Sequence, residues 1–84
     1  MLLEFYGREC PHCKRIRPFL ERLEKSGTEI KRFEVWHNED NAKLMEKYAK
    51  DKCLGVPFLF NTETQDFICG EDSYKRIKEW AGVK

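Results

Sequence analysis

The sequence has no long apolar run and no excess of charge of one sign. Its 84 residues carry 16 Lys and Arg against 15 Asp and Glu, which gives a formal net charge of +1. A broad basic surface of the kind that binds nucleic acid is therefore not expected. No stretch is apolar enough to span a membrane, and the first residues do not resemble a secretory signal. These absences favour a cytoplasmic protein with neither nucleic acid nor membrane as a partner.

Glycine and proline are also scarce, with five and three residues. This scarcity argues against a disordered or low-complexity chain. Hydrophobic residues make up 40% and aromatic residues 13% of the sequence, enough for one core but not for two. We therefore expect a single small domain over residues 1–84, present as a monomer.

The hydrophobic spacing predicts four strands and three helices. The predicted strands are residues 2–6, 29–35, 58–60 and 67–69, and the predicted helices begin at Pro11, after Asn38, and after Asp72 or Ser73. A helix between the first two strands requires a right-handed parallel crossover, whereas the short polar turn between the last two predicts an antiparallel hairpin. The expected fold is α/β, a four-stranded mixed sheet in the order β-α-β-α-β-β-α with three flanking helices.

Chemistry is concentrated in Cys10-Pro11-His12-Cys13, where the first helix is expected to begin. Proline at the first helical position places Cys10 at the cap and Cys13 one turn later. Their Cβ atoms are then roughly 5 to 6 Å apart, close enough for a disulfide to form and break. The helix start lowers thiol pKa values in Cys-X-X-Cys sites. We therefore predict Cys10 as an exposed nucleophile and Cys13 as the resolving thiol.

Several motifs together resemble the thioredoxin superfamily in its short, glutaredoxin-like form, over nearly the whole chain. They are the Cys-Pro-His-Cys motif, Glu4 at the place of a buried carboxylate, Gly55-Val56-Pro57 at the place of a cis-proline loop, and Gly70 at the end of the last strand. The resemblance implies the thioredoxin fold and a substrate-binding groove formed by Val56, a cis Pro57 and Gly70. It also implies a thiol-disulfide oxidoreductase that acts on protein disulfides or glutathione mixed disulfides.

That resemblance implies no bound cofactor, with glutathione as a candidate co-substrate and an unidentified reductase as a partner. Pro11 and His12 are expected to tune the pKa of the cysteines, although His12 also fits a simple spacer. Arg8 adds to a basic region that would attract an anionic thiol, or it is merely solvated. Glu4 is either a buried proton acceptor behind Cys13 or a charge on an edge strand.

Two alternatives concern the cysteines. Cys10 and Cys13 also have the spacing of metal ligands, so a metal-binding or iron-sulfur scaffold of the same fold is the main rival function. Cys53 and Cys69 are separated from this motif and from each other. We interpret them as small apolar residues of the core, with Cys69 as a regulatory thiol the less favoured alternative.

Overall fold

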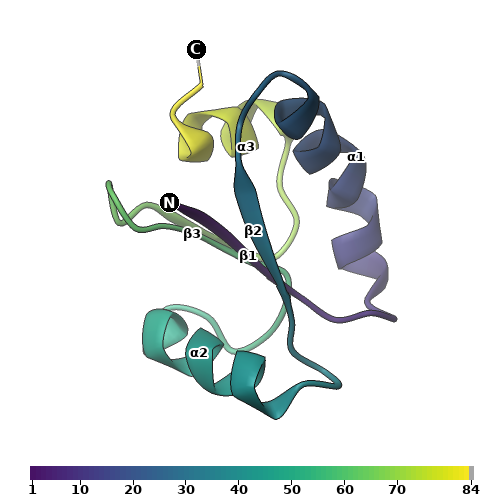
Figure 1. The fold of residues 1–84 in the computed structure, drawn as a ribbon, viewed down its shortest axis with the longest axis vertical. Coiled ribbons are helices and arrows are strands. Elements are labelled where there is room, and N and C mark those ends of the chain that lie inside the picture. The colour runs from purple at the N-terminus through teal and green to yellow at the C-terminus, as the bar shows by residue number, and fades with distance from the viewer. Residues whose placement is uncertain (84) are drawn as a thin grey trace.

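The computed structural model describes residues 1–83 and has the predicted order of elements (Figure 1). The elements are β1 (Leu2–Tyr6), α1 (Pro11–Lys25), β2 (Ile30–Glu34), α2 (Glu39–Ala49), β3 (Phe58–Asn61), β4 (Phe67–Cys69) and α3 (Tyr74–Ala81). The sheet has the order β2-β1-β3-β4. β1 runs parallel to β2 and antiparallel to β3, and β3 runs antiparallel to β4. The predicted parallel pairing of the first two strands and the antiparallel hairpin of the last two are both present.

Alternate residues of β1 point to opposite faces of the sheet, and each face has its own core. Leu2 packs with α1 and α3 in a mainly aliphatic cluster that includes the fully buried Trp80. Leu3 and Phe5 pack with α2 in an aromatic cluster around Phe58. The sheet is therefore a middle layer between α1 with α3 on one side and α2 on the other (Figure 1).

Each helix begins with a side chain that caps it. Cys10, Asn38 and Ser73 each accept a hydrogen bond from the backbone N–H three residues later. The capping bond satisfies one of the unpaired N–H groups of the first turn. Ser73 rather than Asp72 is the cap of the last helix, and Cys10 takes at α1 the place that a serine or aspartate usually occupies.

The connection from β1 to α1 is fixed by Gly7. The Trp36 ring lies so close to Gly7 that any Cβ at this position would collide with it. The carbonyl oxygen of Gly7 accepts a hydrogen bond from the Cys10 N–H at 3.0 Å. A larger residue at position 7 would therefore displace the turn that leads into Cys10.

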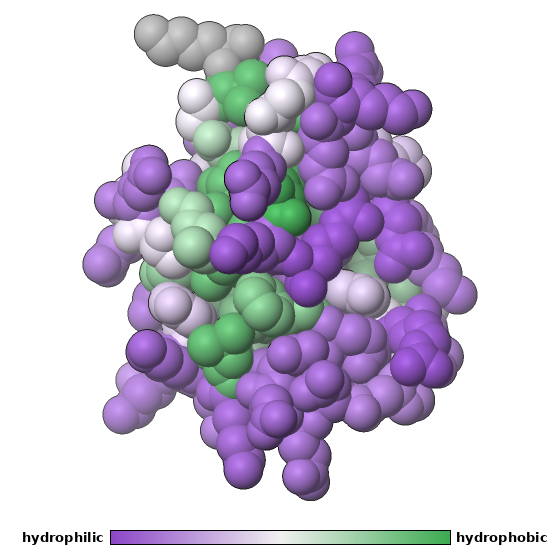
Figure 2. All heavy atoms as spheres, in the orientation of Figure 1, coloured by the Kyte–Doolittle hydropathy of each residue, from purple (hydrophilic) through white to green (hydrophobic). Residues whose placement is uncertain are grey.

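The surface is mostly polar on the face shown in Figure 2. Hydrophobic residues gather in the middle of that face, between α2 and the layer of α1 and α3 (Figure 2). Within residues 1–83, none of the helices has the length and apolar character needed to cross a membrane.

Candidate active site

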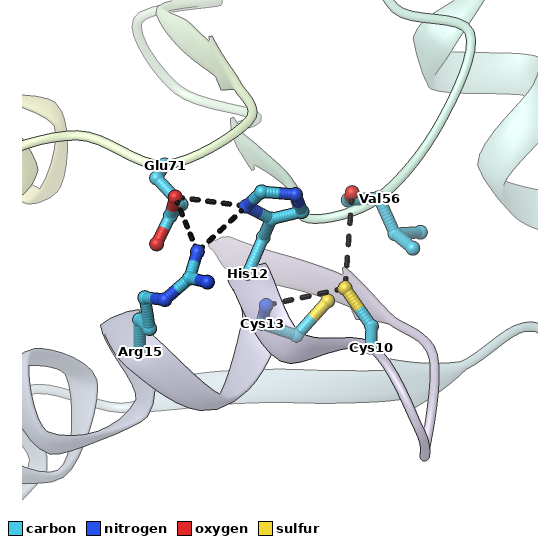
Figure 3. A network of polar contacts seen from close by, with 6 residues as sticks. All are labelled: Cys10, His12, Cys13, Arg15, Val56 and Glu71. Atoms are coloured by element: carbon cyan, nitrogen blue, oxygen red, sulfur yellow. Dashed lines mark hydrogen bonds and ion pairs between the residues drawn. The ribbon is translucent and has the colours of Figure 1, made fainter.

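Cys10 lies at the junction between the β1–α1 turn and the first turn of α1 (Figure 3). Its sulfur accepts a hydrogen bond from the Cys13 N–H at 3.2 Å and lies 3.9 Å from the Val56 carbonyl oxygen. Only 2% of Cys10 is exposed. The prediction of an exposed Cys10 is therefore wrong, because the Val56 segment, 46 residues away in sequence, lies beside its sulfur.

Cys13 differs from Cys10 in its surroundings, although both are free thiols. It is 1% exposed and packs in the first turns of α1. Burial raises the pKa of Cys13 to about 12, and the contact with Cys10 and the negative charge of Glu4 act in the same direction. The Cys13 thiol thus stays protonated at neutral pH. The Cys10 sulfur, in contrast, accepts a hydrogen bond from a backbone N–H, and such a bond stabilises a thiolate.

Glu4 is buried in an interior strand, so its interpretation as an edge-strand charge is wrong. Like Leu2, it points to the face covered by α1, the helix that carries Cys13. Burial raises the pKa of Glu4 to about 7, although the positive charge of Arg32 acts against this shift. Arg32 Nε lies 3.3 Å from Glu4 Oε1, and Arg32 also donates a hydrogen bond to Glu24 at 2.6 Å. Glu4 is therefore a carboxyl group that exchanges a proton near neutral pH.

His12 points toward the segment after β4, not toward the cysteine sulfurs (Figure 3). Its Nδ1 lies 2.8 Å from a Glu71 carboxylate oxygen, and Arg15 donates to the same oxygen at 2.9 Å. Hydrogen bonds from His12 and then Arg15 lower the pKa of Glu71. Glu71 was not among the predicted site residues, because nothing in a local pattern links residues 59 positions apart.

The Val56-Pro57 peptide bond is cis, as the resemblance implied. Gly70 has φ +95°, a conformation that favours glycine, and its N–H donates to the Pro57 carbonyl oxygen at 2.8 Å. Gly70 is thus joined to the Val56-Pro57 segment, whose Val56 carbonyl oxygen lies near Cys10. Arg8 is exposed and is held by its backbone N–H, which donates to Glu34 at 2.9 Å. Among the described residues, the Arg8 side chain makes no hydrogen bond to either cysteine.

Cys53 and Cys69 are joined in a disulfide, which corrects their interpretation as unpaired apolar residues. Their Cα atoms are 5.5 Å apart although 16 positions separate them. Register explains the pairing. Cys69 lies opposite Phe58 in the hairpin, so the end of β4 returns to the loop between α2 and β3, where Cys53 lies.

Cys10 and Cys13 were also considered as ligands of a metal ion or an iron-sulfur cluster. In residues 1–83, no group of three or more His, Cys, Asp or Glu side chains is arranged to hold a metal ion. The Cys53–Cys69 disulfide also removes the two further thiols that would complete a four-cysteine site. The structure therefore gives the metal-scaffold hypothesis no support.

A sequence profile described as Thioredoxin matches residues 1–81. The chain belongs to the thioredoxin family. Among solved structures, the glutaredoxin grx-1 from Archaeoglobus fulgidus is similar, with a TM-score of 0.66 and 24% sequence identity over 94% of this chain and 83% of that chain. No curated protein matches the chain. The family match confirms the predicted superfamily, which is one of thiol-disulfide oxidoreductases. The similar structure confirms the predicted thioredoxin fold.

Proposed function

We propose that this thioredoxin-family protein catalyses dithiol-disulfide exchange with Cys10 as the nucleophile and Cys13 as the resolving thiol. The observation that carries the proposal is the difference between two adjacent sulfurs. The Cys10 sulfur accepts a hydrogen bond from a backbone N–H at the start of α1, whereas burial keeps the Cys13 thiol protonated. Substrates are protein disulfides or glutathione mixed disulfides.

In the first step, the Cys10 thiolate attacks one sulfur of the substrate disulfide. A Cys10–substrate mixed disulfide forms, and the other substrate sulfur leaves as a thiolate. Positive partial charge at the start of α1 favours the attacking thiolate. We take the Val56 carbonyl oxygen, which lies 3.9 Å from the Cys10 sulfur, as the acceptor for a backbone N–H of an extended substrate.

In the second step, Cys13 loses its proton and its sulfur attacks Cys10 in the mixed disulfide. The second substrate sulfur leaves and takes up a proton, so the substrate has gained two electrons and the enzyme holds a Cys10–Cys13 disulfide. We assign the Cys13 proton to Glu4, because Glu4 has a pKa of about 7 and lies close enough to raise the pKa of Cys13 by its charge. An external dithiol or glutathione then restores the two thiols.

The test is covalent trapping of a disulfide substrate, with insulin as the probe. The experiment uses a Cys53→Ser/Cys69→Ser background, so that only Cys10 and Cys13 can form adducts. Adding Cys13→Ser should give a mixed disulfide that persists, because nothing resolves it, whereas adding Cys10→Ser should give almost none. The background variant alone should turn over without accumulating adduct.

Equal trapping in the two variants, or more on Cys10→Ser, would contradict the assignment of the nucleophile. Absence of trapping in both, with no insulin reduction by the unmodified protein, would remove the enzymatic function itself. The reducing system that restores the Cys10 and Cys13 thiols then identifies the reducing partner. Turnover with glutathione and its reductase favours glutathione as the co-substrate, and turnover with a thioredoxin reductase favours that enzyme.

A further inference from the structure

A second pair of cysteines lies beside the proposed active site and takes no part in the exchange described above. The Cys53–Cys69 disulfide connects the loop after α2 to the last residue of β4. Cys69 is exposed and Cys53 half-buried, and both line a surface hollow of about 490 Å³. Cys69 therefore borders the solvent, from which an external thiolate would approach the disulfide.

This disulfide holds one end of the loop that contacts Cys10. We call residues 54–57 the substrate loop. At its start, Cys53 is bonded to Cys69; at its end, the Pro57 carbonyl oxygen accepts a hydrogen bond from the Gly70 N–H. The two anchors are consecutive residues, Cys69 and Gly70, so the loop is closed into a small ring at the end of β4.

Apart from Pro57, which is fully buried, the substrate loop has little else to hold it. Within residues 1–83, no backbone-to-backbone hydrogen bond involves the N–H or carbonyl of residues 54–56, and the Leu54 side chain is fully exposed. The Gly55 carbonyl oxygen contacts the Cys53 sulfur at 3.1 Å, and the Val56 carbonyl oxygen lies near Cys10. Loss of the covalent anchor would therefore increase the freedom of the segment that sits over the nucleophile.

We propose that Cys53–Cys69 is a second redox centre, which fixes the substrate loop when oxidised and releases it when reduced. A thiolate of an external dithiol attacks the Cys69 sulfur, which forms a mixed disulfide and frees the Cys53 thiolate. The second thiol of the reductant then displaces Cys69. The protein gains two electrons and two protons, and the reductant leaves as its disulfide.

Release of the loop affects substrate binding more than it affects the exchange reaction itself. A fixed Val56 carbonyl is ready to receive a substrate backbone, whereas a mobile loop must be ordered each time a substrate binds. We therefore expect reduction of this centre to raise KM for insulin roughly three- to tenfold, with a smaller change in kcat. This part of the inference rests on the proposed function; the redox behaviour of the pair does not.

The redox behaviour is tested in a Cys10→Ser/Cys13→Ser variant, where Cys53 and Cys69 are the only thiols. The folded protein is equilibrated in glutathione buffers of graded ratio, alkylated with iodoacetamide and analysed by mass spectrometry. We expect a reversible transition between the disulfide and two alkylated cysteines. A pair that resists dithiothreitol until the protein unfolds, or that never forms a disulfide, would overturn the proposal.

The state of the loop is measured by exchange of the Gly70 amide proton, which donates to Pro57. We expect exchange at least about tenfold faster in the reduced form than in the oxidised form. The Asn61 amide, which donates to Asp66 within the same hairpin, serves as the control and should change little. Unchanged exchange at Gly70 would overturn loop release, whatever the activity.

Kinetics with insulin, run with glutathione and its reductase at a ratio at which the titration leaves Cys53–Cys69 oxidised, compare the protein carrying the intact disulfide with Cys53→Ser/Cys69→Ser. An Ile77→Val variant controls for lost stability, because Ile77 is buried in the core away from the loop. A higher KM in the cysteine variant alone supports the proposal, and equal KM values overturn its effect on binding. Absence of activity in all three proteins would count against the proposed function, while the titration and the Gly70 amide still decide the redox centre.

Discussion

The molecule holds two cysteine pairs that differ in what surrounds them. Cys10 and Cys13 belong to one helical turn, are almost fully buried, and are thiols. Cys53 and Cys69 join a loop to a strand, border open solvent, and form a disulfide. The first pair has a backbone N–H and a buried carboxyl group to control its protons, whereas neither is found at the second pair among residues 1–83. A cysteine pair thus acquires its role from its environment.

The largest expected effect separates the two sulfurs of the first pair. In a Cys53→Ser/Cys69→Ser background at pH 8, iodoacetamide should label Cys10 at least about a hundredfold faster than Cys13. A thiol with a pKa of about 12 is almost entirely protonated at this pH, and the protonated form does not react. Both residues are similarly buried, so the ratio reports ionisation more than access.

Mass spectrometry of the labelled peptides measures this ratio. The same protein unfolded in urea should label both cysteines at similar rates. Faster labelling of Cys13 in the folded protein would reverse the roles of the two thiols.

Glu4 gives the first pair a pH dependence that the second pair lacks. Because the folded-state pKa of about 7 exceeds the usual 4.5, protonated Glu4 favours folding. Its contribution is fully present below pH 4.5 and is lost as the pH rises through 7. The difference between a pKa of 4.5 and one of about 7 corresponds to about 3 kcal/mol in the free energy of unfolding.

Urea denaturation at pH 4 and pH 8 measures this contribution. The unmodified protein should lose up to about 3 kcal/mol more than Glu4→Gln over this interval. Resolution of the mixed disulfide by Cys13 should also be slower in Glu4→Gln, most clearly near neutral pH. Parallel pH profiles for the two proteins would show that Glu4 does not titrate in this range.

The second pair should contribute to stability through the loop that it closes. The disulfide joins residues 16 positions apart and so restricts the conformations of the unfolded chain. Cys53→Ser should therefore lower the free energy of unfolding by about 2 to 3 kcal/mol under oxidising conditions. In dithiothreitol the variant and the unmodified protein should become nearly equal. A difference that persists in dithiothreitol would arise from packing of Cys53 instead of the disulfide.

The smallest effect concerns the charges near the first pair. Glu71 holds His12 and Arg15 on the side away from the cysteine sulfurs. Glu71→Gln should remove the compensating negative charge and favour the Cys10 thiolate. The Cys10–Cys13 disulfide should then become more oxidising by roughly two- to fivefold in equilibrium constant against glutathione. His12→Tyr should shift the constant the opposite way, and no shift in either variant would make His12 a spacer.

The sequence by itself determined the order of the elements and the position of the redox motif. Hydrophobic spacing and caps are local properties, and so is the turn of helix that joins Cys10 to Cys13. The resemblance also placed Pro57 and Gly70 correctly, because their motifs are short and contiguous. For the same reason, burial of Glu4 behind this helix was among the predicted alternatives.

Only the tertiary structure decided which distant residues meet. Strand register brings Cys69 to Cys53, and the loop before β3 covers Cys10. The segment after β4 likewise places Glu71 against His12. Such contacts depend on how layers pack and on which face a strand presents, and one residue of register would exchange the faces. The local sequence pattern does not determine which faces and layers meet. The burial of Cys10 and the Cys53–Cys69 disulfide could therefore be seen only in the folded structure.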